Sequence, residues 1–164
     1  SAAKAIIMLL FRLMNQTLET DKYLEVNSVY DAAKAYIDEG GFDSTDTQLQ
    51  SVEMDAQLSL TPEFPYNWMY DGSRPQMPGF EMEITCKSLF LIFKDSGETD
   101  VGKANVFVND VYCMTADPHK NNWLHCNAVL LFWETESRSH KVRITVTEED
   151  QNKKFTILGF GYTI

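Results

Sequence analysis

The sequence predicts a mainly β protein: an antiparallel β-sandwich of jelly-roll type, with an α-helix at its N-terminus. Two observations lead to this prediction. From Phe80 onward, short apolar runs follow one another with turn residues between them and with no helical pattern. In residues 140–147 and again in residues 153–163, apolar and polar side chains alternate, as expected of strands with one buried face. Closely spaced strands without intervening helices are typical of antiparallel sandwiches and jelly rolls.

The chain opens with a helix-forming segment, residues 2–14, that is apolar on all sides apart from two basic residues. A helix of this kind is normally buried on most of its faces. Its uninterrupted apolar run, residues 5–11, is far too short to span a bilayer, so we expect no membrane span. We interpret residues 1–27 as the last helix of an upstream domain followed by a linker, with an apolar surface that this domain or a homo-oligomer covers. Residues 28–164 then form the sandwich domain.

The segment between the helix and the first strand gives a less regular pattern. Residues 29–41 fit either a short helix closed by Gly40-Gly41 or an irregular arm that lies against the sandwich. Residues 42–50 are polar and turn-rich, and prolines then mark a loop-rich region around residues 66–72. We therefore expect this part of the chain to contribute loops instead of sheet.

The strand pattern continues to the end of the chain. The runs that carry it are residues 80–86, 88–94, 103–108, 111–115, 127–134, 140–147 and 153–163. Asn109-Asp110 separates two of these runs, which predicts a hairpin on a two-residue turn. The last run is more apolar than the run before it, and this favours a central strand.

The length of 164 residues and the formal net charge of −10 bound the size and the partners of the protein. The length fits one domain with a full core. Because phosphate repels an acidic surface, we expect neither nucleic acid nor an anionic membrane as a partner, whereas a neutral sugar is compatible. Acidic surfaces also keep proteins soluble, and this reason alone is sufficient to explain the charge.

Three cysteines, Cys86, Cys113 and Cys126, are odd in number, widely spaced and without a Cys-x-x-Cys motif. A disulfide framework is therefore not expected. We expect buried free thiols, with Cys113 and Cys126 in the strand core. Free thiols favour a reducing, cytoplasmic compartment, although the sequence leaves the localisation open.

The chemically active side chains form no catalytic motif and no metal signature. A Ser/His/Asp site needs a nucleophile beside an oriented base, whereas His119 and His125 flank a loop and His140 is expected to begin a strand and cap a turn. The spacing of the histidines and cysteines matches no zinc signature. Loop carboxylates offer hard oxygens for a structural calcium ion, without a calcium-loop motif. They are Asp43, Asp46, Asp95, Glu98 and Asp100. We therefore expect no cofactor other than such a calcium ion.

Two aromatic clusters in turn-rich segments are the candidate ligand-binding residues. Sugars are held by aromatic faces that stack on C–H surfaces and by polar side chains that bond the hydroxyls. The clusters are Tyr66, Trp68 and Tyr70, and Asn121, Asn122, Trp123 and His125. A tryptophan at a junction of loop and strand also serves as a plug over the end of a core, and this alternative stays open. Trp133, inside a predicted strand, could point to either face, and of the two we expect the core.

Several spaced pieces of the chain carry a resemblance to a known family. They are residues 64–68, 89–94, 102–109, 122–123 and 140–163. From about Ser28 to its end, the chain resembles the C-terminal accessory β-sandwich that follows the catalytic domain in many bacterial SGNH/GDSL-type hydrolases. The helix within residues 1–27 is similar to the last helix of that hydrolase domain.

The resemblance implies a non-catalytic module of an esterase that acts on acylated carbohydrate. The Gly-Asp-Ser-Leu-like nucleophile block of the family is absent, and Asp117-Pro118-His119 has the wrong spacing for its Asp-x-x-His block. The resemblance therefore assigns hydrolysis to an upstream domain, which is the expected partner. Two roles stay open for this chain: binding of carbohydrate, or a structural role in packing on the hydrolase domain or in oligomerisation, with no ligand of its own.

Overall fold

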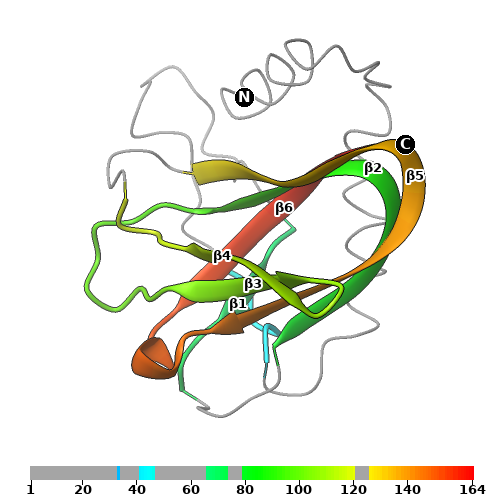
Figure 1. Ribbon diagram of the computed structural model, residues 1–164. Helices are drawn as coiled ribbons and strands as arrows, with labels where there is room; N and C mark the ends of the chain where they lie inside the picture. The colour runs from blue at the N-terminus through cyan, green and yellow to red at the C-terminus, as the bar shows by residue number, and fades with distance from the viewer. Residues whose placement is uncertain (1–32, 34–40, 47–65, 74–78, 121–125) are drawn as a thin grey trace, which may run out of the picture.

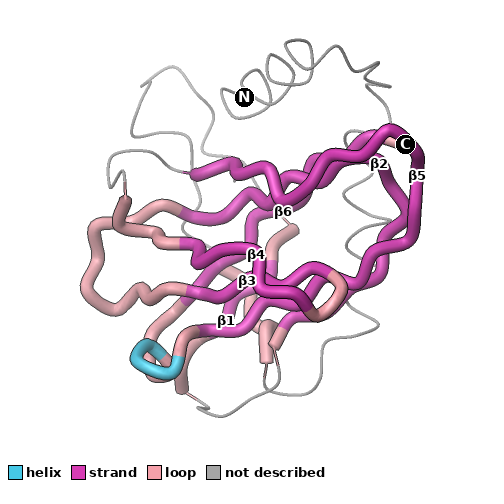
Figure 2. The backbone as a smooth tube through the Cα atoms, viewed as in Figure 1, coloured by secondary structure: helices cyan, strands magenta, loops and turns pink. Residues whose placement is uncertain are grey.

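The computed structural model of the chain describes residues 33, 41–46, 66–73, 79–120 and 126–164 (Figures 1 and 2). In these residues a 6-stranded antiparallel sheet has the order β1-β6-β2-β5-β3-β4, which confirms the predicted mainly antiparallel β fold. Its elements are β1 (Trp68–Tyr70), β2 (Phe80–Lys94), β3 (Ala104–Val108), β4 (Val111–Ala116), β5 (Cys126–Val146), the short 3-10 helix η3 (Glu148–Asp150) and β6 (Phe155–Thr163). The expected N-terminal helix lies outside the described residues. No helix in the described ranges is long and apolar enough to cross a membrane.

β2 and β5 pair with each other over nearly their whole length. The sequence predicts two separate strands in each of these stretches, and that prediction is wrong. In β2 the predicted break falls between Cys86 and Ser88, where the register with β5 shifts, because Cys86 pairs with Arg138 and Ser88 pairs with Trp133. The ladder continues on both sides of this irregularity. In β5 the polar residues 134–139 continue the strand with most of their side chains in solvent. Polarity at this point therefore marks an exposed stretch of strand and not a loop.

The sheet turns back on itself because β2 and β5 bend together (Figure 1). β6 pairs with the C-terminal half of β2, and β3 pairs with the C-terminal end of β5. The two ends of the sheet consequently face each other across one core. Phe80, at the start of β2, stacks on Phe160 of β6 with 5.6 Å between the ring centroids, and it meets the ring of Trp68 edge-on at 5.1 Å.

Two predictions about the C-terminal half are confirmed. All of β6 is buried, and it lies between β1 and β2, as expected of a central strand. The hairpin of β3 and β4 turns on Asn109 and Asp110, whose φ angles are 51° and 63°. Two consecutive left-handed residues define the type I′ turn that matches the twist of a hairpin, and Asn and Asp tolerate this conformation better than most residues do.

The cysteines follow the prediction only in part. Cys86 is fully buried, but Cys113 is exposed and Cys126 is partly exposed, so the expectation that the latter two lie in the core is wrong. Cys113 is on β4, an edge strand, at a register shift opposite Val106 and Phe107. A residue at a bulge is not held to the inward and outward alternation of the strand. Cys126 is the first residue of β5.

Trp133 was expected in the core, and this prediction is wrong because its side chain is 54% exposed. It pairs with Ser88 on the outer side of the sheet, while the preceding pair, Phe132 and Leu89, belongs to the core side. A strand period of two therefore decides the direction of each side chain, and a tryptophan in the middle of a strand is not buried by its position alone.

β1 lies in the region for which the prolines predict loops. Trp68 and Tyr70 are buried in the core and Met69 between them is partly exposed, so this short strand buries two large rings. The segment 41–46 adds to the outer side of β1. Ser44 and Met69 exchange backbone N–H to carbonyl bonds of 3.2 and 2.8 Å. This pairing brings Asp46 to the edge of the sheet, where the candidate site lies.

Candidate functional site

The structure separates the residues that the sequence proposes for ligand binding. Trp68 and Tyr70 are buried in the core, and the Tyr70 hydroxyl donates a 2.7 Å hydrogen bond to the backbone carbonyl of Gln151. Burial, followed by the charge of Asp71, raises the pKa of Tyr70, so its hydroxyl remains a donor. Tyr66 is 48% exposed. In this cluster only Tyr66 exposes its ring to solvent. The rings of Trp68 and Tyr70 lie in the core and are not accessible for stacking on a sugar. Asn121, Asn122, Trp123 and His125 lie outside the described residues.

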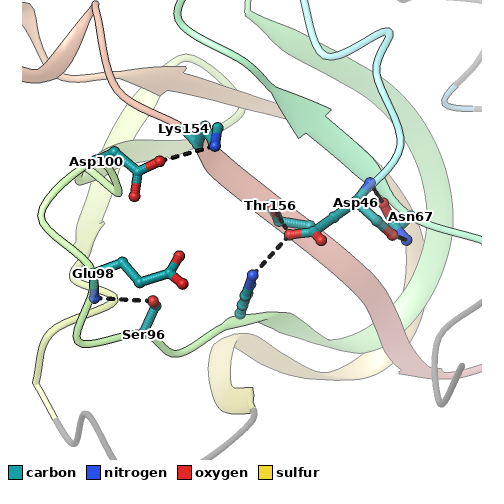
Figure 3. Close-up of polar contacts among 8 residues, drawn as sticks. Asp46, Asn67, Ser96, Glu98, Asp100, Lys154 and Thr156 are labelled. Carbon is teal, nitrogen blue, oxygen red and sulfur yellow. Dashed lines mark hydrogen bonds and ion pairs between the residues drawn. The ribbon is translucent and has the colours of Figure 1, made fainter. Parts of the chain in front are cut away.

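A hollow of about 170 Å³ lies where β1, β2 and β6 meet two loops (Figure 3). The segment 41–46 forms one side of it and the loop after β2 forms the other side. Its lining residues are Thr45, Asp46, Met69, Lys94, Glu98, Val101, Lys154 and Thr156. The sequence analysis did not select this set of residues as a site, although it did select Asp46 and Glu98 as loop carboxylates.

Asp46 is held in place by its backbone. The side-chain amide of Asn67 accepts a 2.8 Å hydrogen bond from the Asp46 N–H and donates a 3.1 Å bond to the Asp46 carbonyl. Asn67 thus gives Asp46 the two bonds that a neighbouring strand would give, one step beyond the pairing of Ser44 with Met69. The position of the Asp46 carboxylate is therefore fixed by the sheet edge and not by a free loop.

The carboxylate of Asp46 is almost buried and has two partners at the floor of the hollow. Oδ2 of Asp46 accepts a 3.0 Å bond from Nζ of Lys94, the last residue of β2, and a 3.2 Å bond from the hydroxyl of Thr156 in β6. Neighbouring strands therefore supply an ammonium group and a hydroxyl to one carboxylate. Charge-assisted hydrogen bonds of this kind are shorter and stronger than neutral ones.

A second ion pair lies at the rim of the hollow. Nζ of Lys154 lies 2.8 Å from Oδ2 of Asp100, and the backbone N–H of Lys154 donates a 2.7 Å bond to the Asp100 carbonyl. The side-chain hydrogen bond lowers the pKa of Asp100 and raises the pKa of Lys154. Both groups are therefore charged at neutral pH, although both are about half exposed. In Figure 3, Asp100 and Glu98 lie on one side of the hollow and Asp46 lies on the other.

The hollow offers hydrogen-bond donors and acceptors at short range. Ammonium groups and hydroxyls donate, carboxylates accept, and Met69 and Val101 supply apolar surface. A polyhydroxylated ligand needs such a mixture, since each of its hydroxyls both donates and accepts. The volume is below the roughly 300–1,000 Å³ of ordinary small-molecule sites. The hollow is therefore of a size for one sugar unit and not for a chain.

The same carboxylates were considered as ligands of calcium. Asp46 and Asp100 instead each have a lysine partner, Lys94 and Lys154, within 3.0 Å. In the described residues, no three His, Cys, Asp or Glu side chains come together in a way that could hold a metal ion. The expected calcium ion stays a prediction.

The described histidines lie in structural positions. Nε2 of His119 lies 2.9 Å from the backbone carbonyl of Val101. His140 lies inside β5 and is buried, so the prediction that it begins a strand is wrong. Its Nδ1 does contact the hairpin turn, at 3.1 Å from the side-chain amide of Asn109. Its Nε2 lies 3.7 Å from a carboxylate oxygen of Glu134. None of these contacts is with a serine or cysteine side chain.

The thiols of Cys86 and Cys113 are not activated. Burial, followed by the charge of Glu134, raises the pKa of Cys86 to about 12. Burial also raises the pKa of Cys113. A catalytic cysteine requires the opposite shift, because the thiolate is the nucleophile.

The sequence matches no protein-family model, and no curated protein shows significant similarity to it. Among solved structures, it is similar to a two-domain esterase active on acetylated mannans that was co-crystallised with mannopentaose. That match has a TM-score of 0.55 and 16% identity, and it covers 77% of this chain and 35% of that chain. At this identity the likeness shows a shared fold.

Two further solved structures are similar over a smaller part of the chain. One is a family two carbohydrate esterase from Cellvibrio japonicus, with a TM-score of 0.43, 16% identity and coverage of 60% of this chain and 27% of that one. The other is an acetyl xylan esterase from the rumen bacterium Butyrivibrio proteoclasticus, with a TM-score of 0.37, 16% identity and coverage of 55% and 26%. The chain therefore spans about a third or less of the carbohydrate esterases that it resembles.

Proposed function

We propose that this chain is a non-catalytic accessory module of an SGNH/GDSL-type esterase, a jelly-roll-like sandwich that binds carbohydrate. The observation that carries the proposal is the unequal coverage in the match to the two-domain esterase. The match covers 77% of this chain but only 35% of that enzyme. Such coverage is typical of one domain of a larger protein. The mannans and mannopentaose named for that esterase suggest the class of ligand.

The hollow beside Asp46 supports the binding role. Its polar groups are fixed before a ligand arrives, because Asn67 holds Asp46 and the carboxylate in turn holds Lys94. Preorganised groups bind more tightly, since less entropy is lost when the ligand arrives. Lys154 and Asp100 at the rim are charged and half exposed, so they are the groups that a sugar hydroxyl meets first.

The proposal of a non-catalytic role agrees with the chemistry of the described residues. His119 contacts a backbone carbonyl, and His140 contacts an amide and the carboxylate of Glu134. The pKa of Cys86 is raised far above neutral pH. Hydrolysis is then the task of a separate hydrolase domain, which is the proposed partner.

A calorimetric titration tests the binding role. The parent protein is titrated with mannopentaose, xylopentaose and cellopentaose, and we expect saturable heat with at least one of them. Lys154→Gln removes an ammonium group from the rim and should weaken binding about tenfold, the usual value of a charge-assisted hydrogen bond. Lys103→Gln is the matched control, because Lys103 is equally exposed and pairs with Asp117 outside the hollow lining. Equal affinity for both variants would contradict the hollow as the binding site, and no heat with any sugar would contradict carbohydrate binding.

A structural role is the second candidate, and the outer side of β5 favours it. Leu130 and Trp133 are large apolar side chains with about half of their surface in solvent. Exposed apolar residues that lie close together mark surfaces that contact another protein. Under this role, adding the hydrolase domain should raise the melting temperature and protect Trp133 from acrylamide quenching, with Trp133→Phe as the spectroscopic control. No change in either quantity would contradict the structural role.

A further inference from the structure

A second surface with sugar-binding chemistry lies at the opposite end of the strand order from β1, on the outer face of β3 and β4. Phe107 of β3 pairs with Tyr112 of β4 on one side and with Arg143 of β5 on the other. Asn105 pairs with Thr115 two residues along the same strand. Val106, between Asn105 and Phe107 on β3, is fully buried, so the five side chains of these pairs lie on the outer face. We call this set the Tyr112 face.

The polar groups of the Tyr112 face have a fixed direction. The hydroxyl of Thr115 donates a 2.7 Å bond to Oδ1 of Asn105. Since a hydroxyl has one hydrogen, the 2.9 Å contact of Thr115 with the Tyr112 hydroxyl requires Tyr112 to donate. The row therefore runs from Tyr112 through Thr115 to Asn105. Both ends of the row can still form hydrogen bonds with a ligand. The Tyr112 oxygen has lone pairs that accept, and the amide of Asn105 has N–H groups that donate.

The aromatic groups of the face have unequal access to solvent. The guanidinium of Arg143 lies over the Phe107 ring, 4.1 Å from its centroid, and covers one side of it. Phe107 and Tyr112 meet edge to face with 6.0 Å between their centroids. Tyr112 is 57% exposed. The Tyr112 ring is thus oriented by Phe107 and remains open for stacking on the C–H surface of a sugar.

The charged groups around the Tyr112 face already have contacts, which favours a neutral ligand. The guanidinium of Arg143 lies on the ring of Phe107, and the neighbouring Lys141 forms a 3.2 Å ion pair with Glu81. A phosphate or an acidic peptide would need cationic groups free to receive it. A neutral sugar needs an open ring and directed hydroxyl partners, and this face provides both.

We propose that the Tyr112 face is a second carbohydrate-binding surface, which takes a neutral glycan with one ring stacked on Tyr112 and its hydroxyls bonded by Asn105 and the Tyr112 oxygen. This inference rests on the proposed carbohydrate-binding function but assigns the contact to residues outside the hollow. It explains why an edge strand of an acidic protein exposes a tyrosine whose hydroxyl is held by a directed row of hydrogen bonds.

Calorimetric titration of the parent and of a set of variants with mannopentaose, xylopentaose and cellopentaose tests the inference. Tyr112→Ala should weaken binding by at least about tenfold, because it removes both the ring and the hydroxyl. Tyr112→Phe keeps the ring and should lose only about threefold. Val111→Ala is the matched control, since Val111 is an exposed apolar neighbour on β4 whose side chain has the opposite direction.

The outcomes separate this inference from the function on which it rests. If Tyr112→Ala is less stable, Tyr112→Phe and Thr115→Val, which shortens the hydrogen-bond row, still show whether affinity changes in a folded protein. Full affinity in the Tyr112 variants, together with a loss in Lys154→Gln, overturns the Tyr112 face and leaves carbohydrate binding in place. The absence of binding by the parent protein overturns both.

Discussion

Asn109 and His140 join the hairpin turn to β5. The side-chain amide nitrogen of Asn109 lies 3.1 Å from Nδ1 of His140, and the amide oxygen accepts a 2.9 Å bond from the backbone N–H of Lys141. Because the amide oxygen is used by Lys141, the amide nitrogen donates to His140 and the imidazole proton is on Nε2. This nitrogen is directed at Glu134, 3.7 Å away. One turn residue thus fixes both the hairpin and the tautomer of a buried histidine.

Replacing Asn109 should separate these two roles. Asn109→Gly keeps the left-handed backbone but removes two side-chain hydrogen bonds, which should lower the free energy of unfolding by about 1–3 kcal/mol. Asn109→Ala should cost about 1–2 kcal/mol more, because alanine is strained at a φ of 51°. Chemical denaturation measures both values. Asp110→Gly is the control, with a φ of 63°, and it should be neutral or stabilising. An Asn109→Gly variant as stable as the parent would show that the amide contributes nothing.

Gly72 should tolerate no side chain. Its φ is 71°, and a Cβ atom would lie 2.5 Å from the backbone carbon of Asn152 and 2.7 Å from the nitrogen of Lys153. Gly72→Ala should therefore destabilise by about 2–4 kcal/mol, from backbone strain and overpacking together. Gly159→Ala is the matched control, because a Cβ there meets nothing within 4 Å. Thermal unfolding should place that variant within about 1 kcal/mol of the parent. Similar melting temperatures for both variants would contradict the close approach at Gly72.

The pair formed by Asp46 and Lys94 should contribute more to stability than an exposed pair. Lys94→Met removes the ammonium partner of a nearly buried carboxylate and should cost about 3 kcal/mol. Lys141→Met breaks the exposed pair with Glu81 and should cost less than about 1 kcal/mol. Urea denaturation at neutral pH measures the two differences. Equal losses would mean that solvent screens both pairs alike.

The stability of the protein should fall in acid partly through Asp150. Burial raises the pKa of this carboxyl, but hydrogen bonds from the Lys153 ammonium, the Lys103 N–H and the Thr147 hydroxyl outweigh burial, so its pKa is lowered. A lowered folded-state pKa gives stability that is present above the ordinary carboxyl pKa of about 3.9 and is lost as the pH falls through the folded value.

Asp150→Asn should therefore cost about 1–2 kcal/mol at pH 7 and flatten the decline of stability below about pH 4. Denaturation at a series of pH values measures this slope. Glu148→Gln, an exposed change in the same short helix, should leave the slope as it is in the parent. A parent-like slope in Asp150→Asn would assign the acid sensitivity to other carboxyls.

Much of the β structure could be predicted because its signal is local. The turn at Asn109-Asp110 needs only the left-handed preference of two residues, and the central position of β6 follows from its apolar composition. The continuity of β5 could not be predicted, because pairing with β2 on both sides of the polar residues 134–137 makes one strand of two apolar runs. The direction of Trp133 also depends on a register that only the partner strand defines.

Single residues of the hollow could be predicted from the sequence, but their assembly into one site could not. Asp46 is a conspicuous carboxylate in a turn-rich segment, and Glu98 and Asp100 form a similar group. Nothing local shows that Asp46 meets Thr156, which lies 110 residues away in the sequence. That contact depends on segment 41–46 pairing with β1 and on β1 pairing with β6. Local composition likewise made Trp68 a candidate ligand residue and left open that it plugs the core, and its position in β1 buries it in the core.

The most direct test of carbohydrate binding is a titration followed by the backbone amide signals in a two-dimensional ¹H–¹⁵N NMR spectrum. Mannopentaose is added in millimolar excess to the labelled parent protein. Saturable shifts confined to Asp46, Lys94, Lys154 and Thr156, with or without Tyr112 and Thr115, are the predicted result. No shift at any amide with mannopentaose, xylopentaose or cellopentaose would contradict it and would favour a structural module.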